Sequence, residues 1–283
     1  MFHSTAWVSD YESARDKLMS TVGLRVLEDT RIEDPRIARR GGMTWIGDNS
    51  LELGQPILPG TATARFVERH GPGMHSIALQ VDDLAATCVH LEAEGVRAVK
   101  VSEHIAFSHP ADTGGVFIEW FSDEHDIDPH FGAVVPPVRR EPLLRVDRMA
   151  FVGAVVEAPQ ELASRLARLL GTSITFAVEG APPGAPHVGV SLGDCTLALY
   201  PLPGAASGAL WGSALPGPRV HVLGLLVPDL PSAASALARA GIEPIRTEDH
   251  AIVLPPDATG CVPMVVTDRL CPGDPRIVPE VQP

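Results

Sequence analysis

The chain lacks the features that tie a protein to a membrane or to nucleic acid. No apolar run reaches the roughly 20 residues that span a bilayer, so we expect no transmembrane helix. Basic residues are few, with 22 Lys and Arg against 35 Asp and Glu, and the formal net charge is −13. This balance argues against nucleic acid or an anionic membrane as the main partner. It leaves room for a small anionic ligand, because such a ligand needs only a local basic cluster.

Cysteines are also few, and none of them forms a CxxC pair, which argues against a zinc knot. The sequence begins without a basic and apolar leader, so we expect no signal peptide. We therefore predict a cytoplasmic protein with reduced thiols at its four cysteines, which are Cys88, Cys195, Cys261 and Cys271.

The 283 residues, 45% of them hydrophobic, are enough for one large domain or two of ordinary size. The chain repeats itself with a period of about 70 residues, and self-similarity at a fixed period indicates duplicated structural units. Each repeat has a strand, an acidic helix start, an apolar helix, a glycine that ends the helix, and further strands. A glycine in this place suits the left-handed cap of a helix. The four helix ends are Gly23, Gly95, Gly171 and Gly241, and the four acidic starts are Asp10, Asp83, Glu157 and Asp229.

A Pro-rich and charged stretch separates the second repeat from the third and is predicted to be a linker. We therefore predict an N-terminal domain of two repeats at 1–125, a linker at 126–144, and a C-terminal domain of two repeats at 145–270. The remaining residues, 271–283, read as an irregular or extended tail.

One stretch carries a family resemblance. The run GMHSIALQVDDLAATCVHLEAEGVRAV, which starts at Gly73, continues to FSHPADTGGVFIEW, which ends at Trp120. It resembles methylmalonyl-CoA epimerases and, more broadly, the vicinal-oxygen-chelate superfamily of glyoxalases, bleomycin-resistance proteins and extradiol dioxygenases. The resemblance implies an α+β fold of four βαβββ modules, paired into two vicinal-oxygen-chelate domains with curved mixed sheets.

The same resemblance implies a metal site. Its first ligand matches His3, its second matches Glu52 in LELGQP, and its fourth matches Glu119 in GGVFIEW. The third position, a His in the family, is Ser76 here, and His75 stands one residue early. One residue of offset on a strand turns a side chain to the opposite face, so His75 is predicted to face away from the cleft unless a bulge re-aims it.

Three further side chains are candidates for substrate binding: Ser76, His109 and Trp45. His109 matches a family residue in the loop before the closing strand, where it either positions a substrate or orders the turn. The basic pair Arg39-Arg40 either meets an anionic group or lies on the surface.

The C-terminal half has no usable metal ligands at the matching positions, which are predicted to be Arg148, Leu197, Val222 and Val265. We therefore expect no metal there. The four-module layout resembles that of extradiol dioxygenases, but their iron ligands are missing from this half.

The resemblance implies three functions that stay open. The first is a metal-assisted epimerase, isomerase or lyase acting on a small carbonyl or acyl-thioester substrate, with Glu119 as ligand and base and with Mn, Co, Ni, Fe or Mg as the ion. The second is a metal-free protein that binds or sequesters a small molecule, or catalyses a metal-free step of specialised metabolism. The third is an Fe(II)-dependent dioxygenase. The expected partner is a small-molecule substrate, and the chain is expected to be a monomer or a homodimer.

Overall fold

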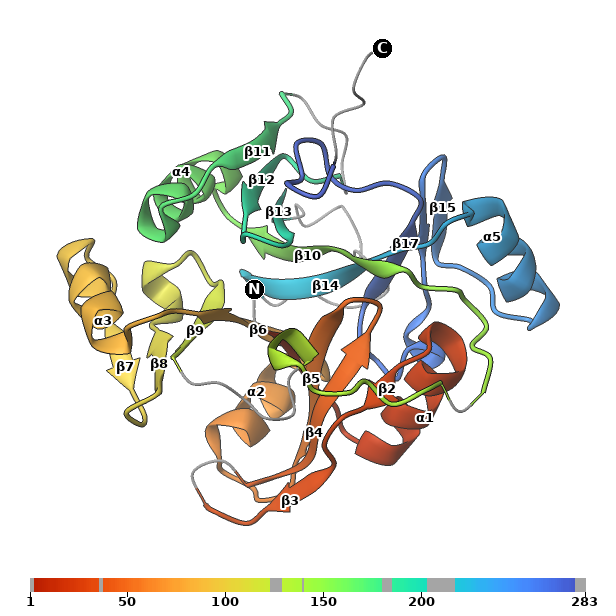
Figure 1. Cartoon of the computed structure of the whole chain (residues 1–283), viewed down its shortest axis with the longest axis horizontal. Coiled ribbons are helices and arrows are strands. Elements are labelled where there is room, and N and C mark those ends of the chain that lie inside the picture. The colour runs from red at the N-terminus through yellow and green to blue at the C-terminus, as the bar shows by residue number, and fades with distance from the viewer. Residues whose placement is uncertain are drawn as a thin grey trace.

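The computed structural model describes residues 3–35, 38–122, 129–138, 140–179, 185–202 and 217–277. These residues form two mixed β-sheets with helices packed on them (Figure 1). The first repeat contains β1 (His3–Trp7), α1 (Tyr11–Val22), β2 (Arg25–Val26), β3 (Thr30–Ile32), β4 (Arg39–Ile46) and β5 (Asn49–Pro56). The helix α2 (Ala62–His70) follows, and then the second repeat: β6 (Gly73–Gln80), α3 (Leu84–Ala93), β7 (Ala98–Lys100), β8 (Ile105–Ser108), η1 (Pro110–Asp112) and β9 (Phe117–Phe121).

The short 3-10 helix η2 (Pro129–Phe131) precedes the second half. The third repeat contains β10 (Arg148–Val156), α4 (Pro159–Leu170), β11 (Ile174–Ala177), β12 (Val188–Ser191) and β13 (Thr196–Pro201). The fourth contains β14 (Arg219–Leu226), α5 (Leu230–Arg239), β15 (Arg246–Glu248), β16 (Ala251–Val253), η4 (Pro256–Ala258) and β17 (Met264–Thr267).

The two sheets have the same plan. The strand order is β2-β4-β5-β1-β6-β9-β8-β7 in the first sheet, with β3 paired to β4, and β11-β12-β13-β10-β14-β17-β16-β15 in the second. In each sheet the first strands of two repeats lie side by side and antiparallel at the centre, as β1 with β6 and β10 with β14. The predicted α+β fold of four modules paired into two halves is confirmed.

The helix ends follow the sequence signals closely. The side chains of Asp10, Asp83 and Asp229 each accept a hydrogen bond from the backbone N–H three residues later, and so cap α1, α3 and α5. The four predicted helix-ending glycines all have positive φ, between 62° and 75°. The third module differs at its start, because Ala158 occupies the N-cap without a side-chain hydrogen bond and Pro159 begins the helix.

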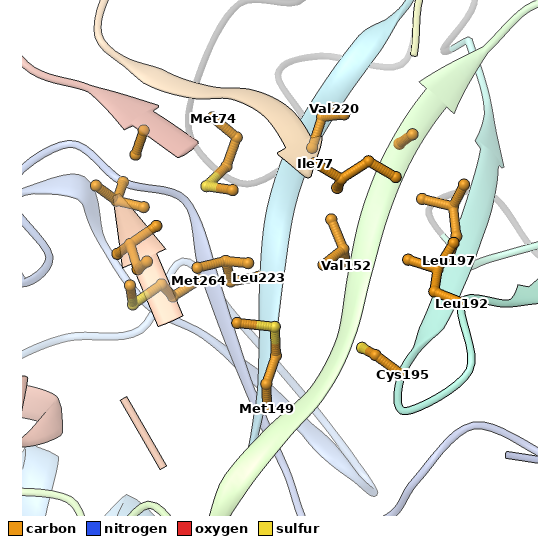
Figure 2. Close-up of a cluster of buried hydrophobic side chains, with 14 of the residues drawn as sticks. Met74, Ile77, Met149, Val152, Leu192, Cys195, Leu197, Val220, Leu223 and Met264 are labelled. Carbon is orange, nitrogen blue, oxygen red and sulfur yellow. The ribbon is translucent and has the colours of Figure 1, made fainter. Parts of the chain in front are cut away.

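One large apolar cluster runs through both halves. Met74 and Ile77 of β6 face Val220 and Leu223 of β14, and all four side chains are fully buried (Figure 2). The same cluster continues through β10 and β13 of the second half and through α1 and β5 of the first half. Burying an aliphatic side chain contributes about 1.5–3 kcal/mol. The two sheets therefore stabilise each other face to face.

Hydrogen bonds and one close backbone approach also connect the two halves. The imidazole of His90 on α3 donates to the carbonyl oxygen of Leu169 on α4 over 3.0 Å. The hydroxyl of Thr21 on α1 donates to the carbonyl oxygen of Ala258 in η4 over 2.9 Å. At Gly115, which has a φ of 89°, a Cβ atom would collide with Pro218. The chain thus approaches the second half too closely there for any side chain.

No helix among the described residues is long and apolar enough to cross a membrane. All four cysteines lie within the described ranges, and each is a free thiol.

Candidate active site

The site is built on one face of the first sheet. His3 of β1 pairs with Ala78 of β6, and Ala78 pairs with Glu119 of β9, so these three residues form a row across neighbouring strands. Paired residues on adjacent strands point their side chains to the same face. Because Ala78 is small, the longer side chains of His3 and Glu119 have room to meet above it. Glu52 reaches the same face from β5, where it pairs with Thr5 of β1.

The three predicted ligands converge in the structure. The Nε2 atom of His3 lies 3.8 Å from Oε2 of Glu52 and 3.8 Å from Oε2 of Glu119. All three side chains are largely buried, with exposed fractions of 6%, 16% and 12% for His3, Glu52 and Glu119. The hydroxyl of Thr5 donates to Oε2 of Glu52 over 3.3 Å. The face thus gathers one imidazole and two carboxylates in a nearly closed space.

An arginine completes the cluster. The Nε atom of Arg39 lies 3.2 Å from Oε1 of Glu52, and both side chains are mostly buried. Side chains alternate between the two faces of a sheet along each strand. Arg39 therefore points to the same face as Met43, the residue that pairs with Glu52. The intervening position on this face is Gly41, which has no side chain to block the arginine. Its neighbour Arg40 points elsewhere and pairs with Glu12.

The environment of Glu119 favours its protonated form. Burial, and after it the negative charge of Glu52, raise the pKa of Glu119 from 4.5 to about 8, while Arg39 acts in the opposite direction. Close to neutral pH this carboxyl can therefore donate a proton and take it back. A group with such a pKa in a buried cleft is typical of acid–base catalysts.

The donor types of this cluster fit a divalent cation. Imidazole nitrogen and carboxylate oxygen are ligands that Mn, Co, Ni and Fe(II) accept. Two donors on one ion lie at most about 4.2 Å apart, and the two distances from His3 fall within this limit. The described residues nevertheless contain no group of three His, Cys, Asp or Glu side chains gathered closely enough to hold a metal ion.

The position expected for a third ligand contains a β-bulge. Thr5 pairs with Ser76, but the next residue, Ala6, pairs with Met74, so His75 is the extra residue. The ring of His75 contacts Trp7 and Phe117. These two residues lie two positions from Thr5 and Glu119 on their strands, so they point to the same face as Thr5 and Glu119. The bulge is the exception that the sequence allowed for, and it turns His75 toward the cleft side. Its Nδ1 atom lies 3.0 Å from the Ser76 hydroxyl.

The other two predicted substrate-binding residues take different places. Trp45 is buried on β4, two residues beyond Met43, with its ring 5.1 Å from that of His130. It therefore walls the face that bears Glu52. The Nδ1 atom of His109 accepts hydrogen bonds from the backbone N–H of Ala111 and from the guanidinium of Arg97, which orders the turn at η1. A contact between either residue and a substrate stays a prediction.

The second half repeats this row of paired residues, but its side chains are apolar. Phe151 of β10 pairs with Gly224 of β14, and Gly224 pairs with Val265 of β17, which is the counterpart of the row His3, Ala78 and Glu119. The ring of Phe151 fills the space where residue 224 would carry a Cβ atom.

The pairing corrects two of the four positions that the sequence suggested for this half. By register the counterpart of His3 is Phe151, not Arg148, and that of Glu52 is Ala198, not Leu197. Arg148 precedes a bulge in β10, so counting along the sequence misplaces it. The side chain of Leu197 enters the core between the sheets instead.

Comparisons with known proteins agree with this architecture. Residues 2–111 match the family model of the Glyoxalase/Bleomycin resistance protein/Dioxygenase superfamily. The mitochondrial methylmalonyl-CoA epimerase of Homo sapiens is 27% identical over 125 residues, which cover 41% of this chain and 70% of the relative. That of Bos taurus is 26% identical over 125 residues, with the same two shares.

One solved structure matches almost the whole chain. A triple mutant of 4-hydroxymandelate synthase from Streptomyces coelicolor superposes with a TM-score of 0.65 at 18% identity, covering 96% of this chain and 94% of that one. At this identity the match concerns the fold of both halves. The resemblance to the vicinal-oxygen-chelate superfamily is thus confirmed by the family model in the N-terminal half, and over the whole chain the match shows the fold. Its relatives include enzymes, among them epimerases.

Proposed function

We propose that the first half is an enzyme that moves a proton at a carbon atom next to a carbonyl group, as epimerases, isomerases and some lyases do. The substrate class is a small carbonyl compound or acyl thioester. The observation that carries this proposal is the buried Glu119, whose pKa of about 8 suits a proton carrier, within 3.8 Å of His3. The names of the matched relatives make methylmalonyl-CoA the first substrate to try.

The proposed roles follow from the contacts. In its ionised form Glu119 takes the proton from carbon, and as a neutral carboxyl it returns the proton. His3 orients the carboxyl oxygens of Glu119 and Glu52, since it lies at the same distance from both. The guanidinium of Arg39, which forms an ion pair with Glu52, is the proposed donor to the enolate oxygen that develops charge. A divalent ion held by His3, Glu52 and Glu119 would add Lewis-acid stabilisation of that oxygen.

The number of proton carriers bears on the reaction type. Strand β4, which lies beside β5 and Glu52, contains only Arg39, Arg40 and uncharged residues and so supplies no second acid. Inversion at carbon needs groups on two sides of the substrate, and Glu52 is the remaining carboxyl. A reaction in which Glu119 alone moves the proton therefore suits this site better than a two-base epimerisation. In an isomerisation Glu119 would return the proton to another carbon atom of the substrate, and in an elimination it would pass the proton to the departing group.

The alternative is a protein that binds a small molecule without changing it. The near closure of the site favours this alternative, because the side chains of His3 and Glu119 are only 6% and 12% exposed and Trp45 walls the same face. For either function we propose a cytoplasmic location, which suits four free thiols, and a small-molecule partner.

The test is proton exchange in deuterated water. The protein is incubated with methylmalonyl-CoA and with a panel of short acyl thioesters and 2-oxo acids, and deuterium incorporation is followed by mass spectrometry. Glu119→Gln should abolish exchange, whereas Glu161→Gln, which changes an exposed carboxylate on α4, should leave it unchanged. Tight binding of a panel member without exchange would favour the binding protein, and exchange that survives Glu119→Gln would contradict the proposal.

Elemental analysis of protein purified without a His tag answers the question of a metal. About one equivalent of a divalent ion, lost in both His3→Ala and Glu119→Ala, would identify the cluster as its site. If the ion is iron, oxygen consumption with Fe(II) tests the dioxygenase alternative directly.

A further inference from the structure

A cavity lies where the two halves meet. It has a volume of about 330 Å³ and is bounded by α2, by β6 and β9 of the first sheet, and by the start of β14 in the second half. Its wall includes Phe66 of α2 and Phe117 of β9, and it is completed by Pro218 and Arg219. We call it the junction pocket. Phe117 is two residues before Glu119 on β9, so the pocket adjoins the acid–base site without containing it.

The junction pocket is strongly basic. Arg65, Arg69 and Arg219 line it, together with His70, and no Asp or Glu is part of its described lining. None of the three arginines forms an ion pair with an acid of the described residues. In a chain with a net charge of −13, a cluster of three uncompensated guanidinium groups is a local exception.

Arg219 carries the argument furthest because its residue is only 5% exposed. Its Nη1 atom donates to the carbonyl oxygen of His70 over 3.2 Å, and its Nη2 atom lies 3.3 Å from Nδ1 of His221. Neither partner is a carboxylate, and its Nε atom has no hydrogen-bond partner among the described residues. A buried guanidinium without an anionic partner is costly. An anion bound in the pocket would remove that cost.

The opposite wall is aromatic and uncharged. The ring of His75 meets Phe66 edge to face at 4.6 Å and Phe117 at 4.8 Å, and Phe117 stacks on Phe107 at 5.0 Å. Burial, with a smaller effect of His70, lowers the pKa of His75 to about 3, so its ring is neutral at physiological pH. The wall therefore offers flat apolar surface rather than charge.

We propose that the junction pocket binds a small ligand that carries a compact anionic group, a phosphate or a carboxylate, next to a flat apolar part. The guanidinium groups of Arg219 and Arg69 hold the anion, and the aromatic wall packs against the apolar part. This site is separate from the proton chemistry of Glu119 and does not depend on it. It gives the second half a binding role, because that half supplies Arg219.

The test measures binding of three one-ring probes to the whole chain by isothermal titration calorimetry at low salt. Phenyl phosphate and benzoate represent the two anion types, and phenol is their neutral counterpart. We expect at least one anion to bind tenfold or more tightly than phenol, and the stronger of the two identifies the anionic group. Equal binding of all three probes, or no binding of either anion, would overturn the proposal.

Variants locate the binding. Arg219→Gln should weaken anion binding at least fivefold, and so should the double variant Arg65→Gln/Arg69→Gln, which changes two exposed side chains and so keeps the test valid if Arg219→Gln does not fold. Arg168→Gln, an exposed arginine on α4, is the matched control and should bind like the wild type. Anion binding that is unchanged in the double variant and in a folded Arg219→Gln protein would show that the pocket is not the site.

Discussion

The two halves of this chain share a fold and differ in what fills the equivalent face of each sheet. Across the three central strands the first half has His3, Ala78 and Glu119, and the second half has Phe151, Gly224 and Val265. The polar row is enclosed together with Glu52 and Arg39, whereas the apolar row belongs to a compact hydrocarbon cluster.

This difference separates two uses of the same scaffold. Buried carboxylates cost stability, and buried aromatic and aliphatic side chains contribute to it. The first half thus carries groups that are useful for chemistry and unfavourable for folding. At the equivalent positions the second half has apolar side chains that pack together, and it shares its core with the first half. Four substitutions would test this comparison.

The largest effect is expected from removing the carboxyl of the polar row. Glu119→Gln should lower the rate of proton exchange by about 10²–10⁴-fold, the range typical for loss of a general acid or base. It should also stabilise the protein. Between pH 4.5 and about 8 the folded wild type holds a proton on Glu119 that the unfolded chain releases, so wild-type stability falls as pH rises through this window.

Urea unfolding at pH 5 and pH 8 measures this effect. The unfolding free energy of the Gln variant should not show the fall with rising pH that Glu119 causes. The variant should be about 2 kcal/mol more stable than the wild type at pH 8. An identical pH dependence in both proteins would mean that Glu119 is not held protonated.

The converse substitution adds a carboxyl to the apolar row. Val265→Glu should destabilise the chain by about 3–5 kcal/mol, because Val265 is 5% exposed in an apolar cluster. The loss should grow with pH as the new carboxyl ionises. Val134→Glu, at a side chain that is 88% exposed, is the control and should be nearly neutral. A small loss at Val265 would show that both faces tolerate charge and that the contrast between the halves is superficial.

A third substitution tests whether the halves fold as one unit. Ile77→Ala removes a fully buried side chain of β6 from the core that β14 completes, and should cost about 2–5 kcal/mol. Hydrogen exchange followed by mass spectrometry should show lower protection in β10 and β13 as well as in the first sheet. Val99→Ala, at a half-exposed valine on β7, is the matched control. Protection that falls only in the first half would show that the halves are independent.

The smallest effect concerns the bulged histidine. His75 has a pKa near 3 when folded and about 6.5 when unfolded, so the unfolded chain binds the extra proton and stability falls as pH drops below 6.5. His75→Phe should reduce this loss by about 1 kcal/mol at pH 5, measured as the difference in unfolding free energy between pH 7 and pH 5. His187→Gln, which changes a histidine outside this cluster, is the control and should behave like the wild type.

Much of the fold could be predicted from the sequence because its signals are local. The residues Asp10, Asp83 and Asp229 cap helices, and the four glycines adopt the left-handed conformation that helix ends use. Local signals repeat when a module is duplicated, so the fourfold pattern was visible in the sequence.

The site was only partly predictable because its last details depend on strand register. The approach of His3, Glu52 and Glu119 was expected, but the bulge at His75 is a single inserted residue without a signature in the sequence. The ion pair of Arg39 with Glu52 forms because the long arginine side chain passes Gly41, which has no side chain. The signal that could have revealed this pair is that Arg39, Gly41 and Met43 point to the same face of β4.

The contact between β6 and β14 has a consequence for how the protein behaves at low abundance. When two separate chains bury each other's sheets, dilution drives them apart and the folded form depends on how much protein is present. Here both partners are on one chain, so each meets the other at a fixed effective concentration set by the connecting segment. A cell could make very few copies of this protein, and the pairing of its two halves would be no weaker for it.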